Sequence, residues 1–251
     1  MTIPMIGADP EVFLWDTANK HFVSAATFFP GTKKEPYKVE KGAVQVDGVA
    51  LEFNIQPASN EDEFLDHICS VHTTIQKMVR EVNPNWEIRH TPYATFTREL
   101  WDTVPEEAKE LGCDPDYNSD SGQVNQNPTV RINQAATQLK LGAIRTASGH
   151  IHIGFTDKDE DLTDAMHLED CRFVANYFYK KNFAHPRTTE EWSRVSFYGN
   201  HGAYRPKKYG VELRSPSNTW LGPNGLVSEA SVRKMYKDTI RLFQLMESGH
   251  A

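Results

Sequence analysis

The sequence predicts an α+β protein with a curved, mostly antiparallel sheet and helices packed on its outer face. Three observations predict this class. Four segments alternate apolar and polar side chains with the period of two that is typical of strands. Residues 59–83 and 228–246 instead repeat apolar side chains every three or four positions, as amphipathic helices do. Where the connections between strand-like segments are short, they favour antiparallel pairing.

Size and charge limit the classes of protein that fit. A chain of 251 residues with 39% hydrophobic residues suits one large domain, which we expect to span residues 1–251. The net charge is −7, and this acidic excess argues against a surface that binds nucleic-acid duplexes. A charged fraction of 24% does not suggest disorder.

The cysteines and the hydropathy favour a cytoplasmic protein. Cys69, Cys113 and Cys171 are far apart, odd in number and outside any CxxC pair, which argues against a disulfide scaffold or a zinc ribbon and fits a reducing compartment. No apolar run approaches the ~20 residues of a membrane span, and the first residues do not resemble a signal peptide. We therefore expect no membrane partner.

The segment around which the other elements are arranged is residues 6–16. In a strand, Asp9, Glu11, Phe13 and Trp15 would share one face, and the apolar side chains between them would share the other. Two carboxylates on an inward face are costly unless something compensates their charge, and a divalent cation held by oxygen ligands would do so. The alternative is an edge strand whose acids are solvated.

Residues 17–20 read as a turn, residues 21–26 as a return strand, and residues 30–42 as an exposed loop. Residues 43–48 lead to a second alternating segment, 49–56, whose polar side includes Glu52. Asp47 would lie on the opposite face of a continuous strand, but Asp47-Gly48 is a strong hairpin or bulge signal. A turn there would bring Asp47 and Glu52 to the same face; otherwise Asp47 is only a turn residue.

The helix at 59–83 begins at Asn60, with Glu63 three residues later as in a capping box, and ends before Pro84. We interpret its histidines, His67 and His72, as structural. Residues 86–91 read as another strand. Residues 112–140 are rich in Asn, Gln, Asp and Ser and lack a period, which predicts a long irregular loop that binds substrate, or disorder.

The remaining alternating segments are 149–155, with His150 and His152 on one face, and 209–214, with Glu212 and Arg214 together. A helix is expected over 161–182 between them. The segment 193–208 is basic and could meet a polyphosphate or could simply be a solvated loop. Its basic residues are Arg194, Arg205, Lys207 and Lys208. A turn at 218–224 precedes the last helix.

Acids from several strands together with a histidine can hold two or three hard divalent ions, and Mg²⁺ or Mn²⁺ fits such a set better than zinc does. An arginine two residues after a ligating glutamate points at the same cleft, as phosphoryl transfer requires. The sequence lacks a Walker loop, a Rossmann GxGxxG and a GxSxG elbow. A bound nucleotide would therefore be held by metals and by scattered Arg and Lys residues.

Three segments resemble one enzyme superfamily. GADPEVFLWD is similar to the GxExEFFLFD-type first strand of glutamine synthetase-like enzymes. SGHIHIGF resembles their GxxMHxH strand and the HxHxG strand of glutamate–cysteine ligases, and YGVELRSPSNTWL resembles their [RK]xEFRxPDxxANPYL strand. They occur in the family's order, with DGVALEFN between them. The chain most resembles the compact carboxylate–amine ligases of tailed phages and some bacteria.

The resemblance implies an ATP-dependent ligase that joins a carboxylate to an amine through an acyl phosphate. It implies the glutamine synthetase catalytic-domain fold, Mg²⁺ or Mn²⁺ as metals, ATP as the nucleotide, and a host cytoplasm as the location if the chain is phage-encoded. The metal ligands that it implies are Asp9, Glu11, Asp47, Glu52, His150 and Glu212. The residues that it implies for ATP or catalysis are Arg214, Glu52, Arg194, Arg205, Lys207 and His150.

Asp9 stands where most relatives have Glu, and neither the family's separate N-terminal domain nor its adenylylation loop is evident. We therefore do not carry over the dodecamer, ammonia or glutamate. The identities of the acid and the amine stay open: the target could be a free metabolite, a protein or a modified nucleobase. Homo-oligomer formation also stays open, and the 112–140 segment would select the carboxylate or the amine. Two alternatives are a cupin-type oxygenase or isomerase, suggested by His150-x-His152, and an inactive binding protein on the same scaffold.

Overall fold

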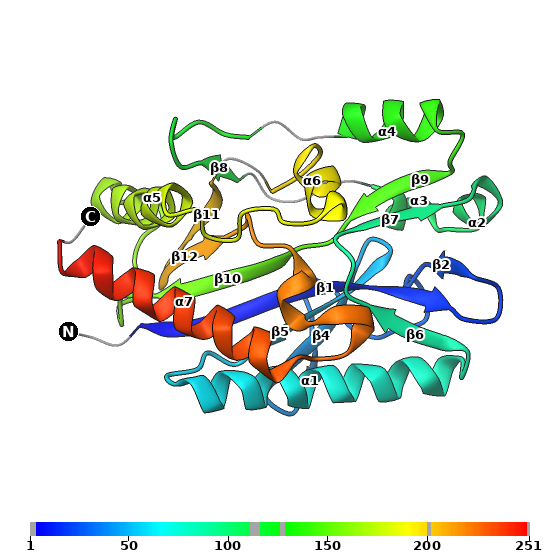
Figure 1. Cartoon of the computed structure of the whole chain (residues 1–251), viewed down its shortest axis with the longest axis horizontal. Helices are drawn as coiled ribbons and strands as arrows, with labels where there is room; N and C mark the ends of the chain where they lie inside the picture. The colour runs from blue at the N-terminus through cyan, green and yellow to red at the C-terminus, as the bar shows by residue number, and fades with distance from the viewer. Residues whose placement is uncertain (1–3, 111–115, 126–128, 200–201, 250–251) are drawn as a thin grey trace.

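The computed structural model describes residues 4–110, 116–125, 129–199 and 202–249, and it confirms the α+β class with a mostly antiparallel sheet (Figure 1). The large sheet has the strand order β3-β4-β5-β1-β10-β12-β11-β8, and β2 and β6 pair with the outer part of β1. Its strands are β1 (Met5–Asp16), β2 (His21–Val23), β3 (Tyr37–Val39), β4 (Gly42–Asp47), β5 (Ala50–Ile55), β6 (Trp86–Arg89), β8 (Tyr117–Asn118), β10 (Gly149–Gly154), β11 (Ala203–Lys207) and β12 (Gly210–Leu213). A second, two-stranded sheet consists of β7 (Tyr93–Phe96) and β9 (Ala143–Thr146).

Strand β1 is the central element, as its sequence predicts. Residues 5–10 pair with β10, residues 11 and 12 pair with β5, and residues 13–16 lie between β2 and β6, always in antiparallel register. Val12 and Leu14 are fully buried on one face, whereas Asp9 and Glu11 are partly exposed on the other. The alternation seen in the sequence therefore separates a core face from a face that borders a cavity.

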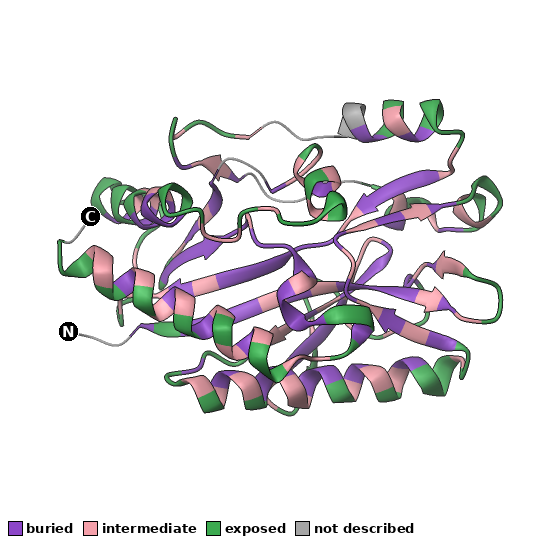
Figure 2. Ribbon diagram, viewed as in Figure 1, coloured by how far each residue is buried: buried purple, intermediate pink, exposed green. Residues whose placement is uncertain are grey.

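Three long helices cover the core face: α1 (Glu61–Val82), α5 (Ala165–Lys180) and α7 (Glu229–Glu247). Figure 2 shows that their buried residues form stripes on the sides that face the sheet. Phe64 of α1 is fully buried against Trp220 and Tyr236, so it joins α1 to α7 and to the turn between the last strand and α7. That turn contains two 3₁₀ helices, η1 (Asn218–Leu221) and η2 (Pro223–Gly225).

The shorter helices are α2 (Arg98–Asp102), α3 (Glu106–Lys109), α4 (Thr129–Gln138) and α6 (Thr189–Val195). Helix α4 packs beside β9, and α6 packs beside β7. On the polar face of the sheet lies a cavity, which Ile132 of α4, Glu110 just after α3, and Lys33 help to line.

Several sequence-based boundaries need correction. Residues 37–39, which we expected in a loop, form the edge strand β3, since Tyr37 and Val39 favour strands and Lys38 keeps the edge polar. Helix α5 begins only at Ala165, because Asp164 caps it. Helix α1 is confirmed, with Asn60 as its N-cap.

The segment 112–140 is not one irregular loop. Tyr117–Asn118 pairs with β11, and Thr129–Gln138 is helical, with Ile132 and Ala136 buried one helical turn apart. The polar composition hid a two-residue strand and a short amphipathic helix. Residues 111–115 and 126–128 lie outside the described part of the chain. Among the described helices, none is both long enough and apolar enough to cross a membrane.

Candidate active site

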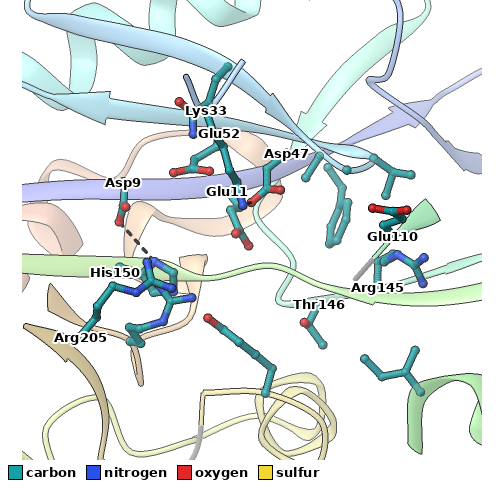
Figure 3. A pocket seen from close by; sticks show the side chains of 18 of the residues that line it. Asp9, Glu11, Lys33, Asp47, Glu52, Glu110, Arg145, Thr146, His150 and Arg205 are labelled. Atoms are coloured by element: carbon teal, nitrogen blue, oxygen red, sulfur yellow. Dashed lines mark ion pairs between the residues drawn. The ribbon is translucent and has the colours of Figure 1, made fainter. Parts of the chain in front are cut away.

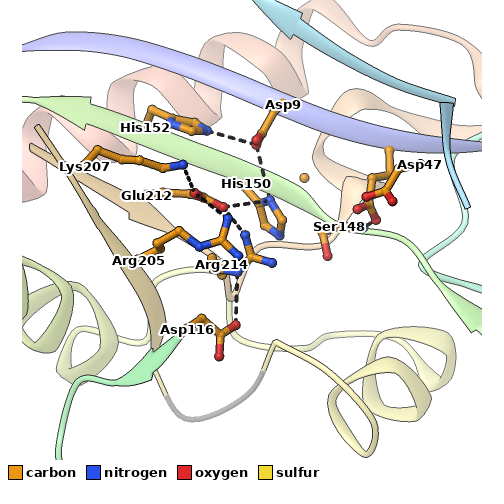
Figure 4. A network of polar contacts seen from close by, with 12 residues as sticks. Asp9, Asp47, Asp116, Ser148, His150, His152, Arg205, Lys207, Glu212 and Arg214 are labelled. Atoms are coloured by element: carbon orange, nitrogen blue, oxygen red, sulfur yellow. Dashed lines mark hydrogen bonds and ion pairs between the residues drawn. The ribbon is translucent and has the colours of Figure 1, made fainter. Parts of the chain in front are cut away.

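Antiparallel register brings the predicted site residues into one row across the polar face of the sheet (Figure 4). Glu52 of β5 lies directly opposite Glu11 of β1, and Asp9 lies opposite His150 of β10. Between β10 and β12, His152 lies opposite Glu212, and between β12 and β11, Glu212 lies opposite Arg205. Directly opposed residues point to the same face of a sheet, so five strands contribute side chains to a single surface.

The first group in this row is a cluster of three carboxylates, Glu11, Asp47 and Glu52. One oxygen of each lies within 4.8 Å of the others. Asp47 joins because residues 48 and 49 form a two-residue hairpin turn between β4 and β5, in which Gly48 has φ of 58°. The turn that Asp47-Gly48 predicts is therefore confirmed, and it places Asp47 on the face of Glu52.

Burial and mutual repulsion perturb these acids strongly. Burial, then the neighbouring Asp47, raises the pKa of Glu11 to about 8, although the Ser148 N–H donates to its Oε2 at 2.7 Å. Burial, together with Asp9, Glu11 and Asp47, raises the pKa of Glu52 well above its ordinary value. Lys33 forms an ion pair with Asp47 at 2.9 Å but does not remove the repulsion. The three acids therefore resist being ionised together, and a bound cation would relieve that repulsion.

The second group mixes carboxylates and imidazoles. Asp9 Oδ1 lies 3.3 Å from His150 Nδ1 and 3.0 Å from His152 Nε2, and His150 Nδ1 lies 3.4 Å from Glu212 Oε1. Burial would raise the pKa of Asp9, but the two histidines outweigh it and hold this pKa well below its ordinary value. Burial would lower the pKa of His152, but Asp9 and Glu212 together outweigh burial and raise it. Burial and Arg214 lower the pKa of His150.

Three buried atoms of this group make no hydrogen bond: Asp9 Oδ1, His150 Nε2 and His152 Nε2. Asp9 Oδ1 and His152 Nε2 are close but are not aligned for one. Buried polar atoms are rarely left unpaired, so these atoms are suited to a ligand. Asp9, His152 and Glu212 can present one atom each within 4.8 Å, which makes them a second candidate metal-binding group.

Basic side chains gather around Glu212, which is almost completely buried. Its carboxylate pairs with Lys207 at 2.8 Å, with Arg205 at 3.3 Å and with Arg214. Arg214 Nε also donates to Asp116 Oδ2 at 3.0 Å. Arg205, Lys207 and Arg214 all line the cavity, whereas Lys208, another basic residue of the 193–208 segment, pairs with Asp159 at 3.1 Å and does not line it.

The cavity has a volume of about 450 Å³ (Figure 3). Asp9, His150 and Arg205 lie at one end of it, and Glu110, Arg145 and Thr146 lie at the other. Ile132 of α4 also lines it, so part of the 112–140 segment does border the candidate site.

Arg194 lies behind the cavity and not on its wall. It is 1% exposed, and its guanidinium donates to Ser148 Oγ at 2.7 Å and to the carbonyl oxygens of Ser215 and Arg214 at 2.9 and 3.1 Å. Burial lowers its pKa to about 10, so it is charged at neutral pH. This placement differs from what a direct contact to a nucleotide phosphate would require.

Some site residues were not among the sequence-based candidates. His152 could have been included, because it shares the face of His150 at a spacing of two. Four others gave no periodic signal in the sequence, since they lie in loops, in short strands or between strands: Lys33, Asp116, Arg145 and Ser148. Only tertiary contacts bring these side chains to the site.

The residues fit divalent metals. Three carboxylates with one oxygen each within 4.8 Å of the others offer the ligands that Mg²⁺ prefers, and the group of Asp9, His152 and Glu212 adds an imidazole that Mn²⁺ tolerates. Comparisons with protein-family models and with curated proteins find no match for this chain.

Proposed function

We propose that the chain is an ATP-dependent carboxylate–amine ligase with a catalytic domain like that of glutamine synthetase. The observation that carries this proposal is the composition of one cavity. A carboxylate cluster and a cationic cluster lie on the same face of one antiparallel sheet, in a cross-strand row from Glu52 to Arg205. Phosphoryl transfer needs both, because the metals must sit beside the cations that hold phosphate oxygens.

In this proposal Glu11, Asp47 and Glu52 hold one divalent ion, and Asp9 and Glu212 hold a second with His150 or His152. Bound Mg²⁺ or Mn²⁺ would neutralise phosphate charge and polarise the phosphoryl group. The cations Arg205, Lys207 and Arg214 lie where they can donate to phosphate oxygens. They are already oriented by Glu212 and Asp116, so little reorganisation is needed when a phosphate arrives.

The proposed reaction has two steps. An oxygen of the substrate carboxylate attacks the γ-phosphorus of ATP, the bond to the β,γ-bridging oxygen breaks, and ADP leaves. The nitrogen of the amine then attacks the acyl carbon, inorganic phosphate leaves, and the nitrogen loses a proton to give the amide. The protein contributes mainly position and electrostatic stabilisation, which a rigid sheet face supplies well. The family assignment, the cytoplasmic location and any self-association are part of this proposal.

One observation bears on the cupin alternative. Asp9, His150, His152 and Glu212 would suit a transition metal. However, cupins are double-sheet jelly rolls, and here helices α1, α5 and α7 cover the face on which a second sheet would pack. A cupin-type enzyme would bind one transition metal and would not respond to ATP.

The test measures thermal unfolding and phosphate release with Mg²⁺-ATP and a panel of carboxylic acids and amines, with the products read by mass spectrometry. Millimolar Mg²⁺-ATP should raise the melting temperature, because it binds only the native state. Glu11→Gln and Glu212→Gln should abolish phosphate release with the fold intact, whereas Glu106→Gln, an exposed control, should not. No shift with ATP, or unchanged turnover in both site variants, contradicts the proposal and favours the cupin-type enzyme or the inactive scaffold.

A further inference from the structure

The buried guanidinium of Arg194 connects two parts of the candidate site. Through Ser148 Oγ it holds the residue that precedes β10, and through the carbonyl oxygens of Ser215 and Arg214 it holds the end of β12. Gly199 packs directly on it, and a Cβ there would lie 2.5 Å from a guanidinium nitrogen. The ring of Tyr198 lies within 6 Å of the guanidinium carbons of both Arg194 and Arg214.

Ser148 passes this constraint to the carboxylate cluster. Its hydroxyl accepts from Arg194 at 2.7 Å, while its backbone N–H donates to Glu11 Oε2 at 2.7 Å. The Glu11 N–H in turn donates to the Ser148 carbonyl oxygen at 2.8 Å. One residue therefore fixes the orientation of the Glu11 carboxylate, and Arg194 fixes that residue.

Stability alone does not explain an arginine at this position. No carboxylate among the described residues lies within ion-pair distance of Arg194, so its burial is compensated by carbonyl and hydroxyl oxygens, by the ring of Tyr198 and by more distant acids such as Glu11. A packed apolar side chain usually stabilises a core as well as a buried charge does. What the guanidinium adds is a planar set of donors that reach two strands at once.

We propose that Arg194 is a positioning residue that sets Glu11 and Arg214 relative to each other through Ser148 and the end of β12, and that it does not contact the nucleotide. This role rests on the proposed function, in which Glu11 binds metal and Arg214 binds phosphate. It differs from the direct phosphate contact that the sequence resemblance implies. Residues that orient a metal ligand commonly change metal affinity 10- to 100-fold when they are replaced.

The experiment measures Mn²⁺ affinity by electron paramagnetic resonance without nucleotide. Arg194→Met should weaken Mn²⁺ binding by about tenfold or more. Ser148→Ala, which removes only the hydroxyl acceptor and is the milder change if Arg194→Met folds poorly, should weaken it by about threefold to tenfold. Arg187→Met, an exposed arginine just before the same helix, is the matched control and should leave the affinity unchanged.

Three results overturn the inference. A direct phosphate contact predicts weaker ATP binding with unchanged Mn²⁺ affinity in both variants. A merely structural role predicts a lower melting temperature, again with unchanged Mn²⁺ affinity of the folded fraction. Faster hydrogen exchange of the Ser148 amide in Arg194→Met than in Arg187→Met supports the positioning role, and equal exchange contradicts it. Because exchange needs no ligand, it separates this inference from the proposed function, which fails if the wild-type chain binds neither Mn²⁺ nor ATP.

Discussion

Replacing Glu11 by Gln should stabilise the metal-free protein while it removes metal binding. Glu11 lies beside Asp47 and Glu52 in a cluster with one nearby lysine, Lys33. Gln keeps the size of the side chain and can still accept from the Ser148 N–H, so the substitution removes an ionisable group with little change in packing. Gln cannot ionise, so the variant avoids the repulsion that builds up in the metal-free fold as Glu11 loses its proton beside Asp47 and Glu52.

The magnitude follows from linkage. Burial and Asp47 raise the pKa of Glu11 from 4.5 to about 8, so the folded state keeps a proton that the unfolded state loses over this range. Stability from this group is complete below pH 4.5 and is lost as pH rises through 8. Each pKa unit corresponds to about 1.4 kcal/mol, which gives about 5 kcal/mol as an upper bound. Water in the open cavity and the charge of Lys33 reduce this upper bound, and we expect a change of about 2 kcal/mol in the free energy of unfolding.

The assay is urea unfolding of the metal-free wild type and of Glu11→Gln from pH 5 to 9, repeated with 5 mM Mg²⁺. The wild type should lose stability as pH rises and regain it with Mg²⁺, whereas Glu11→Gln should show a flatter profile and no Mg²⁺ effect. Glu110→Gln, at the far end of the same cavity, should behave like the wild type. Parallel pH profiles for the wild type and Glu11→Gln would refute the reasoning.

Three further predictions test other parts of the fold. His72 and His90 face each other in the core at 2.9 Å, and burial lowers their pKa values to about 3 and about 4, so the contribution of this pair to stability should fall by about 2 kcal/mol from pH 6.5 to 4, against the opposite trend of Glu11. Urea titrations should show a smaller loss in the double Leu variant. Phe64→Ala should lower the free energy of unfolding in urea by about 3–5 kcal/mol, because it leaves a cavity in the core beneath the sheet, and it should leave Mn²⁺ affinity unchanged. Gly48→Ala should cost about 1 kcal/mol and weaken Mn²⁺ binding, because its φ of 58° disfavours a side chain and Asp47 would shift.

Much of the local structure was readable from the sequence. The alternation in residues 6–16 fixed which side chains of β1 face the core, and Asn60 with Glu63 marked the start of α1. The Asp47-Gly48 signal predicted the turn that brings Asp47 beside Glu52. These patterns are local, because they depend on backbone periodicity, capping and turn geometry within a few residues. The strand at 37–39 and the helix at 129–138 were missed, since short elements in polar segments give little periodic signal.

The sequence by itself determined which residues can share a face: Asp9 with Glu11, His150 with His152, and Glu212 with Arg214. Only the tertiary structure decided which faces meet, because strand order and register depend on contacts between distant segments. The tertiary structure placed Glu52 opposite Glu11 on neighbouring strands and brought Asp116 within hydrogen-bond distance of Arg214. It also buried Arg194 behind the cavity. The side-chain period of a strand is a local property of the backbone, whereas burial and cross-strand neighbours are properties of the packed chain.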